Sequence, residues 1–159
     1  MTIRKISEGA LFAAVYVVAT ICIAPIAYGA IQFRISDCML FFCIGKKQNI
    51  AGFAVGGAIA NLMSPLGIID VFMGFTANFI LGILANVIVS KWLIVIIASV
   101  FAGLFIGIEL SVFYATPYIY TAGTVAAGTL CSMVVGVTIY KIFGKNKALR
   151  KSFSDIRNR

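Results

Sequence analysis

The chain contains no histidine, and only 11% of its 159 residues are charged. Without histidine, neither a Ser–His nor a Cys–His catalytic pair can form. The sequence also has no GxxxxGK[ST] motif, so the chain cannot hold ATP phosphates in a P-loop of its own. No carboxylates cluster with the spacing of a metal site, and we expect neither a metal nor another cofactor. These gaps argue against an enzyme.

The cysteines also lack the spacing of a functional motif. None of the four forms a CxxC pair, and all lie in or beside apolar runs: Cys22, Cys38, Cys43 and Cys131. We expect small buried hydrophobic side chains here, without a disulfide bond.

Hydrophobic residues make up 62% of the chain, and the mean hydropathy is +1.06. Soluble domains are about 45–50% apolar and about 25% charged, so much of this surface must face lipid. We expect one all-α membrane domain over residues 1–159. The first apolar run follows Arg4 and Lys5, as in a signal peptide, but it is long and similar runs follow it.

Polar and helix-breaking residues divide the chain into six predicted transmembrane helices. Their approximate bounds are Glu8–Ala27, Asp37–Gly45, Ile50–Met63, Ile68–Ser90, Trp92–Phe113 and Pro117–Phe143. Ser36 or Asp37 is a candidate cap for the second helix, and Thr116 for the sixth. A bilayer core needs about 20 helical residues, so the second and third segments must tilt, extend into loops or be shielded by neighbours.

Basic residues fix the predicted orientation, because Lys and Arg concentrate on the cytoplasmic side. With the N-terminus inside, the inner positions hold all basic residues but Arg34: Arg4, Lys5, Lys46, Lys47, Lys91 and those from Lys141 to Arg159. Both termini are then cytoplasmic, and the net charge of +8 requires no nucleic acid. We interpret residues 144–159 as a basic tail that contacts anionic lipid rather than a specific docking site.

Three acidic residues fall on the opposite, outer side: Asp37, Asp70 and Glu109. Glu109 lies in an apolar helix, about 27 Å along the axis from Lys91. A carboxylate there indicates either a cavity or a partner, so Glu109 is either a ligand contact or a structural partner. Asp70 is also a candidate helix cap. Arg34 and Asp37 are three residues apart and can pair with each other.

Small residues at four-residue spacing predict close helix packing. Gly52/Gly56, Ala54/Ala58 and Gly103/Gly107 are expected to pack internally, whereas Ala10/Ala14 is the best candidate for an external partner. The fourth segment carries Gly74, Asn78, Gly82 and Asn86 along one face. That face is either a helix contact joined by amide hydrogen bonds or, around Asn78, the lining of a cavity.

The remaining function classes are a small-molecule binder, a channel and a secondary transporter. Proton-driven transporters often place carboxylates near the bilayer midplane. Here the acidic residues lie outward, which favours capture of a solute from outside over a proton relay.

The stretches Gln32–Asp37 and Ala60–Asp70 resemble the QueT family, which comprises substrate-binding (S) components of energy-coupling factor (ECF) transporters. The resemblance implies the six-helix S-component fold, a site that opens outward, and uptake of queuosine precursors or related 7-deazaguanines. It also implies docking, through Ala10 and Ala14, on a membrane-embedded coupling subunit that two cytosolic ATPases drive. Docking is thought to topple the S component so that its site faces inward.

For such a flat, polar ligand the outer half offers stacking surfaces, a carboxylate for the donor edge and amides. The candidate residues are Phe33, Tyr114 and Tyr118 for stacking, Glu109 for the donors, Asn61 and Asn78 as amides, and Arg34, Asp37 and Asp70 at the mouth. The loops Ala30–Asp37, Ser64–Gly67 and Tyr114–Pro117 are expected to cover the site. An S component for another vitamin or heterocycle and a stand-alone secondary transporter are the alternatives.

Overall fold

A computed structural model describes residues 2–29 and 32–145, and this part of the chain is all-helical, without a strand. The helices are α1 (Ile3–Ile21), α2 (Ala24–Ala27), the 3-10 helix η1 (Ile35–Cys43), α3 (Lys47–Asn61), α4 (Ile68–Val87), α5 (Lys91–Tyr114) and α6 (Tyr118–Lys145). The predicted all-α class is therefore confirmed. Apart from its first two residues, the predicted basic tail lies outside the described residues.

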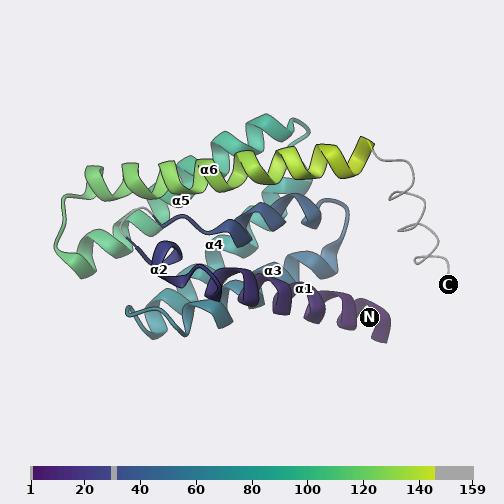
Figure 1. The fold of residues 1–159 in the computed structure, drawn as a ribbon, viewed down its shortest axis with the longest axis horizontal. Coiled ribbons are helices and arrows are strands. Elements are labelled where there is room, and N and C mark those ends of the chain that lie inside the picture. The colour runs from purple at the N-terminus through teal and green to yellow at the C-terminus, as the bar shows by residue number, and fades with distance from the viewer. Residues whose placement is uncertain (1, 30–31, 146–159) are drawn as a thin grey trace.

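The helices form two groups with η1 between them (Figure 1). In one group α3 packs against both α1 and α4, and in the other α5 packs along α6. The 3-10 helix contacts α1, α3, α4 and α6. Its Leu40 and Phe41 are fully buried, together with Tyr16 of α1, Phe53 of α3 and Met133 of α6. The short second segment is thus shielded by its neighbours.

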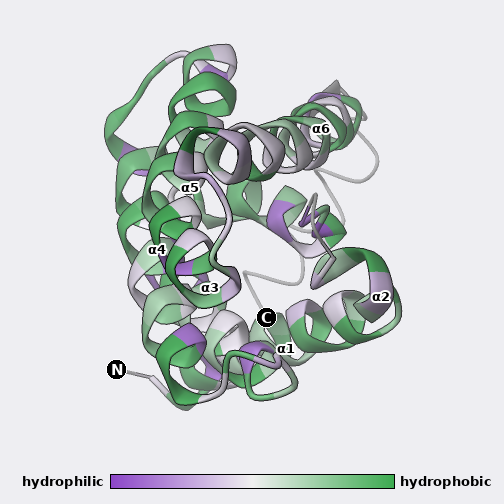
Figure 2. Cartoon of the chain, turned by 90° about the vertical axis from the view of Figure 1, so that its left-hand side faces the viewer, coloured by the Kyte–Doolittle hydropathy of each residue, from purple (hydrophilic) through white to green (hydrophobic). Residues whose placement is uncertain are grey.

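Among the described residues, three helices are long and apolar enough to cross a membrane: Ile68–Val87, Lys91–Tyr114 and Tyr118–Phe143. Hydrophobic residues colour most of the ribbon green in Figure 2. Large apolar side chains such as Val112, Phe72 and Ile119 are exposed on these helices, as expected for surfaces that face lipid. The number of six crossings stays a prediction.

The structure corrects the expected form of the first two segments. The first helix ends at Ile21, and Pro25 lies in the first turn of the separate short helix α2. The second segment is a 3-10 helix of nine residues. At a rise of about 2.0 Å per residue it covers roughly 18 Å, more than an α-helix of equal length. Neither Ser36 nor Asp37 caps it, because η1 has no side-chain cap.

The expected cap of the sixth segment is also wrong. Helix α6 begins at Tyr118, one residue later than predicted. The Thr116 hydroxyl lies 2.8 Å from the Thr121 hydroxyl, so it bonds a side chain of the first turn. The Pro117 carbonyl accepts the backbone N–H of Thr121 at 3.1 Å, which places Pro117 at the cap position.

Contacts gather the segments predicted to be cytoplasmic at one end of the molecule. The Gln48 side chain, in the first turn of α3, donates to the Glu8 carboxylate at 2.8 Å and joins the start of α3 to α1. The Gly45 N–H, in the turn before α3, donates to Asn86 Oδ1 at 2.7 Å and joins that turn to the end of α4. Lys141 lies 4.7 Å from the ring centre of Trp92. The basic positions predicted to be cytoplasmic thus share one end, as one orientation in a membrane requires.

Helices α3 and α4 each place an asparagine side chain against a glycine of the other helix. A Cβ at Gly74 of α4 would overlap the Asn61 side chain of α3, and a Cβ at Gly57 of α3 would overlap the Asn78 side chain of α4. Asn78 Nδ2 donates to the Phe53 carbonyl at 3.1 Å. The four-residue face of α4 is therefore a helix contact joined by amide hydrogen bonds, in which Gly74 makes room for the Asn61 amide and Gly82 for the Ile50 side chain.

The two glycine pairs pack against other helices, as predicted. Gly52 and Gly56 lie against α1, and Gly103 and Gly107 lie against Ala122 and Ala126 of α6. Ala10 and Ala14 are exposed. The cysteines are free, but only Cys43 is buried and Cys38 is half-buried, so the expectation of burial was wrong for the exposed Cys22 and Cys131.

Candidate functional site

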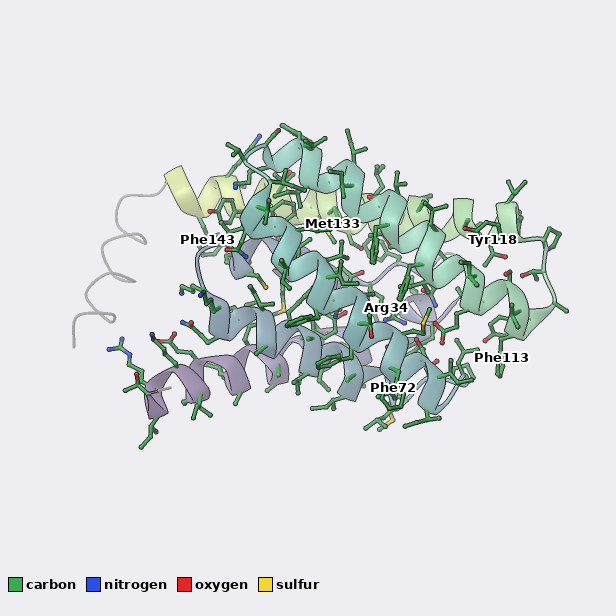
Figure 3. The ribbon with its side chains drawn as sticks, turned by 180° about the vertical axis from the view of Figure 1, so that it is seen from behind. Arg34, Phe72, Phe113, Tyr118, Met133 and Phe143 are labelled. Atoms are coloured by element: carbon green, nitrogen blue, oxygen red, sulfur yellow. The ribbon has the colours of Figure 1, made fainter. Side chains whose placement is uncertain are left out.

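Arg34 points into the helical body, although it precedes η1 in a loop segment (Figure 3). The chain turns at Gln32, whose φ of 48° is left-handed. Arg34 Nε donates to the Ala27 carbonyl at 3.4 Å, and its guanidinium carbon lies 5.3 Å from the ring centre of Tyr28. Its Nη2 lies 3.9 Å from Asp70 Oδ2. The segment before η1 therefore inserts a cation into the protein, with only 5% of the Arg34 residue exposed.

Asp70 lies in the first turn of α4, where a negative charge is favoured by the helix dipole. Asn61, near the end of α3, donates its Nδ2 to both Asp70 Oδ1 and the Asp70 carbonyl, each at 2.8 Å. Helix α4 has no side-chain cap, so the capping role considered for Asp70 is wrong. Its carboxylate instead links α3 to the loop that carries Arg34.

Glu109 is buried in α5, with 9% of the residue exposed, and neither of its carboxylate oxygens has a hydrogen-bond partner within the described chain. It interacts electrostatically with Asp70 and Arg34. Leu66, in the loop between α3 and α4, belongs to the same buried cluster as Leu110. The Ser64–Gly67 loop therefore lies beside the α5 segment that carries Glu109.

Arg34, Asn61, Asp70 and Glu109 form what we call the polar cluster. Within the described residues, five of its buried atoms lack a hydrogen bond: Arg34 Nη2, Asn61 Oδ1, Asp70 Oδ2 and both oxygens of Glu109. Leaving a buried polar group unpaired costs about 1–3 kcal/mol, and more for a charged group. Native proteins retain such atoms mainly where a ligand, water or chemistry satisfies them.

Two further predicted site residues contact other groups. Asp37 accepts the Tyr16 hydroxyl at 2.8 Å, and the ion pair of Arg34 is with Asp70, so the expected Arg34–Asp37 pair is wrong. Asn78 is 7% exposed and donates to α3, which gives it a structural contact. Both interact with the fully buried Tyr16 of α1.

The predicted stacking residues differ in their distance from the cluster. Phe33 is half-buried beside Arg34 in sequence, whereas Tyr114 and Tyr118 are 50% and 38% exposed. The Tyr118 hydroxyl donates to the Leu104 carbonyl at 3.2 Å, and Figure 3 shows Tyr118 near the end of the α5–α6 pair. No described contact joins either tyrosine to the cluster. Tyr28 lies against Arg34 instead, and its hydroxyl donates to the Ala60 carbonyl at 2.5 Å.

Sequence reasoning missed Tyr28 as a site residue. The available signal was its position just after the Pro25 break and just before the Gln32–Asp37 stretch. An aromatic ring between a helix break and a motif is well placed to face the same space as that motif.

The exposed face of α1 carries Ala10 and Ala14, as predicted for a docking surface. A shallow apolar depression lies there, lined by Ala14, Val15, Val18 and Ala19. Small side chains permit the close approach of another helix.

Long apolar helices around a buried, incompletely bonded polar cluster are typical of a helical membrane protein with a functional polar site. The sequence profile of the QueT transporter family matches residues 6–145, and the chain belongs to this family. The queuosine precursor transporter QueT of Lactococcus lactis subsp. cremoris (strain MG1363) is 29% identical over 161 positions, covering 89% of this chain and 93% of that protein. No solved structure matches the chain.

Proposed function

We propose that the chain is the substrate-capture (S) component of an ECF transporter in the bacterial cell membrane, with both termini in the cytoplasm. It binds a 7-deazaguanine precursor of queuosine, such as pre-queuosine or queuine, at its outer end. A membrane-embedded coupling subunit and two cytosolic ATPases then drive release inward. Membership in a transporter family and the kinship with a queuosine precursor transporter support this proposal.

The unpaired atoms of the polar cluster carry the argument for the ligand. Four of them accept hydrogen bonds and one, Arg34 Nη2, donates. A 7-deazaguanine offers the matching excess of donors: its ring N–H, its exocyclic amine and its pyrrole N–H, with one carbonyl oxygen for the arginine. Its ring N–H and amine are adjacent, so one carboxylate can accept both. We assign this paired contact to Glu109.

The remaining candidates take supporting roles. Tyr28, whose ring lies against the Arg34 guanidinium, and Phe33, which precedes Arg34 in the chain, supply the stacking surfaces. Asn61 and Asp70 accept hydrogen bonds from further ligand donors. Asn78 and Asp37 hold α3, α4 and η1 in place behind the cluster. Tyr114 and Tyr118 remain candidates only for the outer rim, because both are exposed.

Docking on the coupling subunit is assigned to α1. Ala10 and Ala14 leave a flat strip on this helix, and neither is covered by another part of the described chain. Tyr16, on the opposite side of the same helix, bonds to Asp37 just after the Arg34 loop. A partner on α1 would therefore rest on the helix that also supports the outer loop.

An uptake assay in liposomes distinguishes the proposed S component from a stand-alone secondary transporter. The purified chain in liposomes is expected to bind a 7-deazaguanine but not to accumulate it. Accumulation is expected only when the coupling subunit and ATPases are co-reconstituted with ATP. Uptake by the chain alone would support a secondary transporter, and binding of a different heterocycle in a thermal-shift panel would support another S-component substrate.

Replacing Ala14 with leucine tests the docking face in the same assay. We expect ligand binding to persist and ATP-driven uptake to be lost, because the larger side chain prevents close approach. Thr138→Leu, an exposed change on α6, is the matched control and should leave uptake intact. Normal uptake by Ala14→Leu would remove α1 from the docking surface.

A further inference from the structure

The side chain of Arg34 is held in the polar cluster by long contacts. Its Nε lies 3.4 Å from the Ala27 carbonyl oxygen, its Nη2 lies 3.9 Å from Asp70 Oδ2, and Nη2 has no hydrogen bond within the described chain. A strong hydrogen bond between a guanidinium and a carboxylate is shorter, at about 2.7–2.9 Å. The place of Arg34 in the cluster therefore depends on the backbone that carries it, which runs from the left-handed turn at Gln32 into η1.

The helix that follows Arg34 has an unusual form. A 3-10 helix rarely continues beyond about three or four residues, because its hydrogen bonds have poor geometry, yet η1 runs for nine. The Asp37 N–H donates to the Arg34 carbonyl at 3.1 Å, so a rotation of η1 about its axis would displace Arg34. Leu40 and Phe41 fix the middle of η1 in the core, but its start, beside Arg34, needs contacts of its own.

Two hydroxyl groups of α1 supply these contacts. The Tyr16 hydroxyl donates to Asp37 Oδ1 at 2.8 Å, and the Thr20 hydroxyl oxygen lies 2.7 Å from that of Ser36. Thr20 also donates to the Tyr16 carbonyl at 2.9 Å, so Ser36 is the donor to Thr20. Tyr16, Thr20 and Ser36 are each at most 1% exposed. Because Ser36 and Asp37 are consecutive, the two bonds together fix the rotation of η1 about its own axis.

We propose that Tyr16 and Thr20 are positioning residues of the solute site, whose hydroxyls hold the start of η1 in the rotation that keeps Arg34 within the polar cluster. The inference rests on the proposed function, because it presumes that the solute contacts Arg34 there. Neither hydroxyl needs to touch the solute, since each bonds to η1. Removal of either hydroxyl frees the start of η1 to rotate, and Arg34 then leaves the cluster for part of the time.

Tyr16→Phe removes the hydroxyl but keeps the ring, whose centroid lies 5.2 Å from that of Phe53. The probe is whichever of queuine and pre-queuosine the wild-type protein binds more tightly, measured by calorimetry in detergent. Affinity is expected to fall about tenfold, because loss of a hydrogen bond to a charged group reduces the population of the binding-competent rotation by about that factor. Tyr140→Phe on α6 is the matched control and should bind as the wild type does.

Thr20→Val provides a second variant with a smaller change. It leaves the buried Ser36 hydroxyl without its acceptor, and affinity is expected to fall about threefold, as for a hydrogen bond between neutral groups. Thr138→Val is its control, because that hydroxyl also donates to a carbonyl four residues earlier but is exposed. Unchanged affinity in both Tyr16→Phe and Thr20→Val would overturn the inference and leave the proposed function intact. Failure of the wild type to bind either precursor would overturn both.

A double-mutant cycle tests whether Tyr16 acts through Arg34. In Arg34→Gln protein, which has already lost the guanidinium, Tyr16→Phe is expected to change the affinity by less than about twofold, because effects of coupled residues are not additive. If Tyr16 only stabilised the fold, Tyr16→Phe would lower affinity by the same factor in both backgrounds, and that result would overturn the inference.

A readout without solute follows the rotation itself. Ile35, which follows Arg34 and begins η1, is 37% exposed. Ile35→Cys, in a background without the native cysteines, is treated with a maleimide, and adding Tyr16→Phe is expected to raise its reaction rate at least about twofold, because local opening governs access to a partly buried group. Tyr140→Phe should leave the rate unchanged. An equal rate with and without the Tyr16 hydroxyl would contradict the proposed hold on η1.

Discussion

Glu109→Gln is expected to weaken the binding of a 7-deazaguanine by about tenfold or more. The substitution nearly conserves the volume of the side chain, but it removes the charge and replaces one of two acceptor oxygens by a donor. The paired contact with the ring N–H and the amine is then lost, at about 1.5–3 kcal/mol for a hydrogen bond to a charged group. Calorimetric titration of the purified protein measures the change.

The control for this prediction is Glu8→Gln. Glu8 accepts from Gln48 at 2.8 Å and pairs with Arg4 at 3.4 Å, at the end of the molecule remote from the cluster. The same chemical change there should leave affinity at the wild-type value. If Glu109→Gln also binds with unchanged affinity, Glu109 does not contact the ligand, and its buried carboxylate must be satisfied in another way.

Gly74→Ala is expected to lower the thermal midpoint by about 5 °C, because overpacking costs about 1–3 kcal/mol. The new methyl group would overlap the Asn61 amide, which two hydrogen bonds hold against Asp70. Either the helices separate or Asn61 turns away and leaves Asp70 without its donor. The higher helix propensity of alanine, up to about 1 kcal/mol, opposes this loss only in part.

Gly123→Ala supplies the matched comparison on α6. A Cβ at Gly123 meets nothing within 4 Å, so the same substitution should leave the midpoint unchanged or raise it. Thermal unfolding followed by tryptophan fluorescence or light scattering distinguishes the two variants. A Gly74→Ala protein as stable as Gly123→Ala would contradict the described packing of α3 on α4.

The sequence singled out the charged residues that the fold brings together more reliably than it predicted their contact partners. Charges in an apolar chain are few, so Arg34, Asp70 and Glu109 stood out individually. The three-residue spacing predicted an ion pair between Arg34 and Asp37. Arg34 instead pairs with Asp70, 36 positions further along, after the left-handed turn at Gln32. A positive φ at a glutamine has no marker in composition or periodicity, so this pairing required the fold.

The two tyrosines illustrate a different limit. Tyr114 lies five residues after Glu109, which is close in sequence but about 140° away around an α-helix. It therefore points away from the side that buries Glu109. Polar and helix-breaking residues divide the sequence into apolar segments. A short apolar run has no periodicity that distinguishes a 3-10 helix from an α-helix, so only the structure shows the form of η1.

Cysteine labelling in intact cells tests most directly the central claim that the polar cluster lies beneath an outward-facing mouth. Phe33→Cys and Lys47→Cys are placed separately in a background without the four native cysteines and exposed to a maleimide that does not cross membranes. The account predicts that Phe33→Cys reacts from outside and is protected by a 7-deazaguanine, while Lys47→Cys reacts only after permeabilisation. The account would be contradicted if Lys47→Cys reacted from outside, or if the ligand did not reduce the labelling of Phe33→Cys.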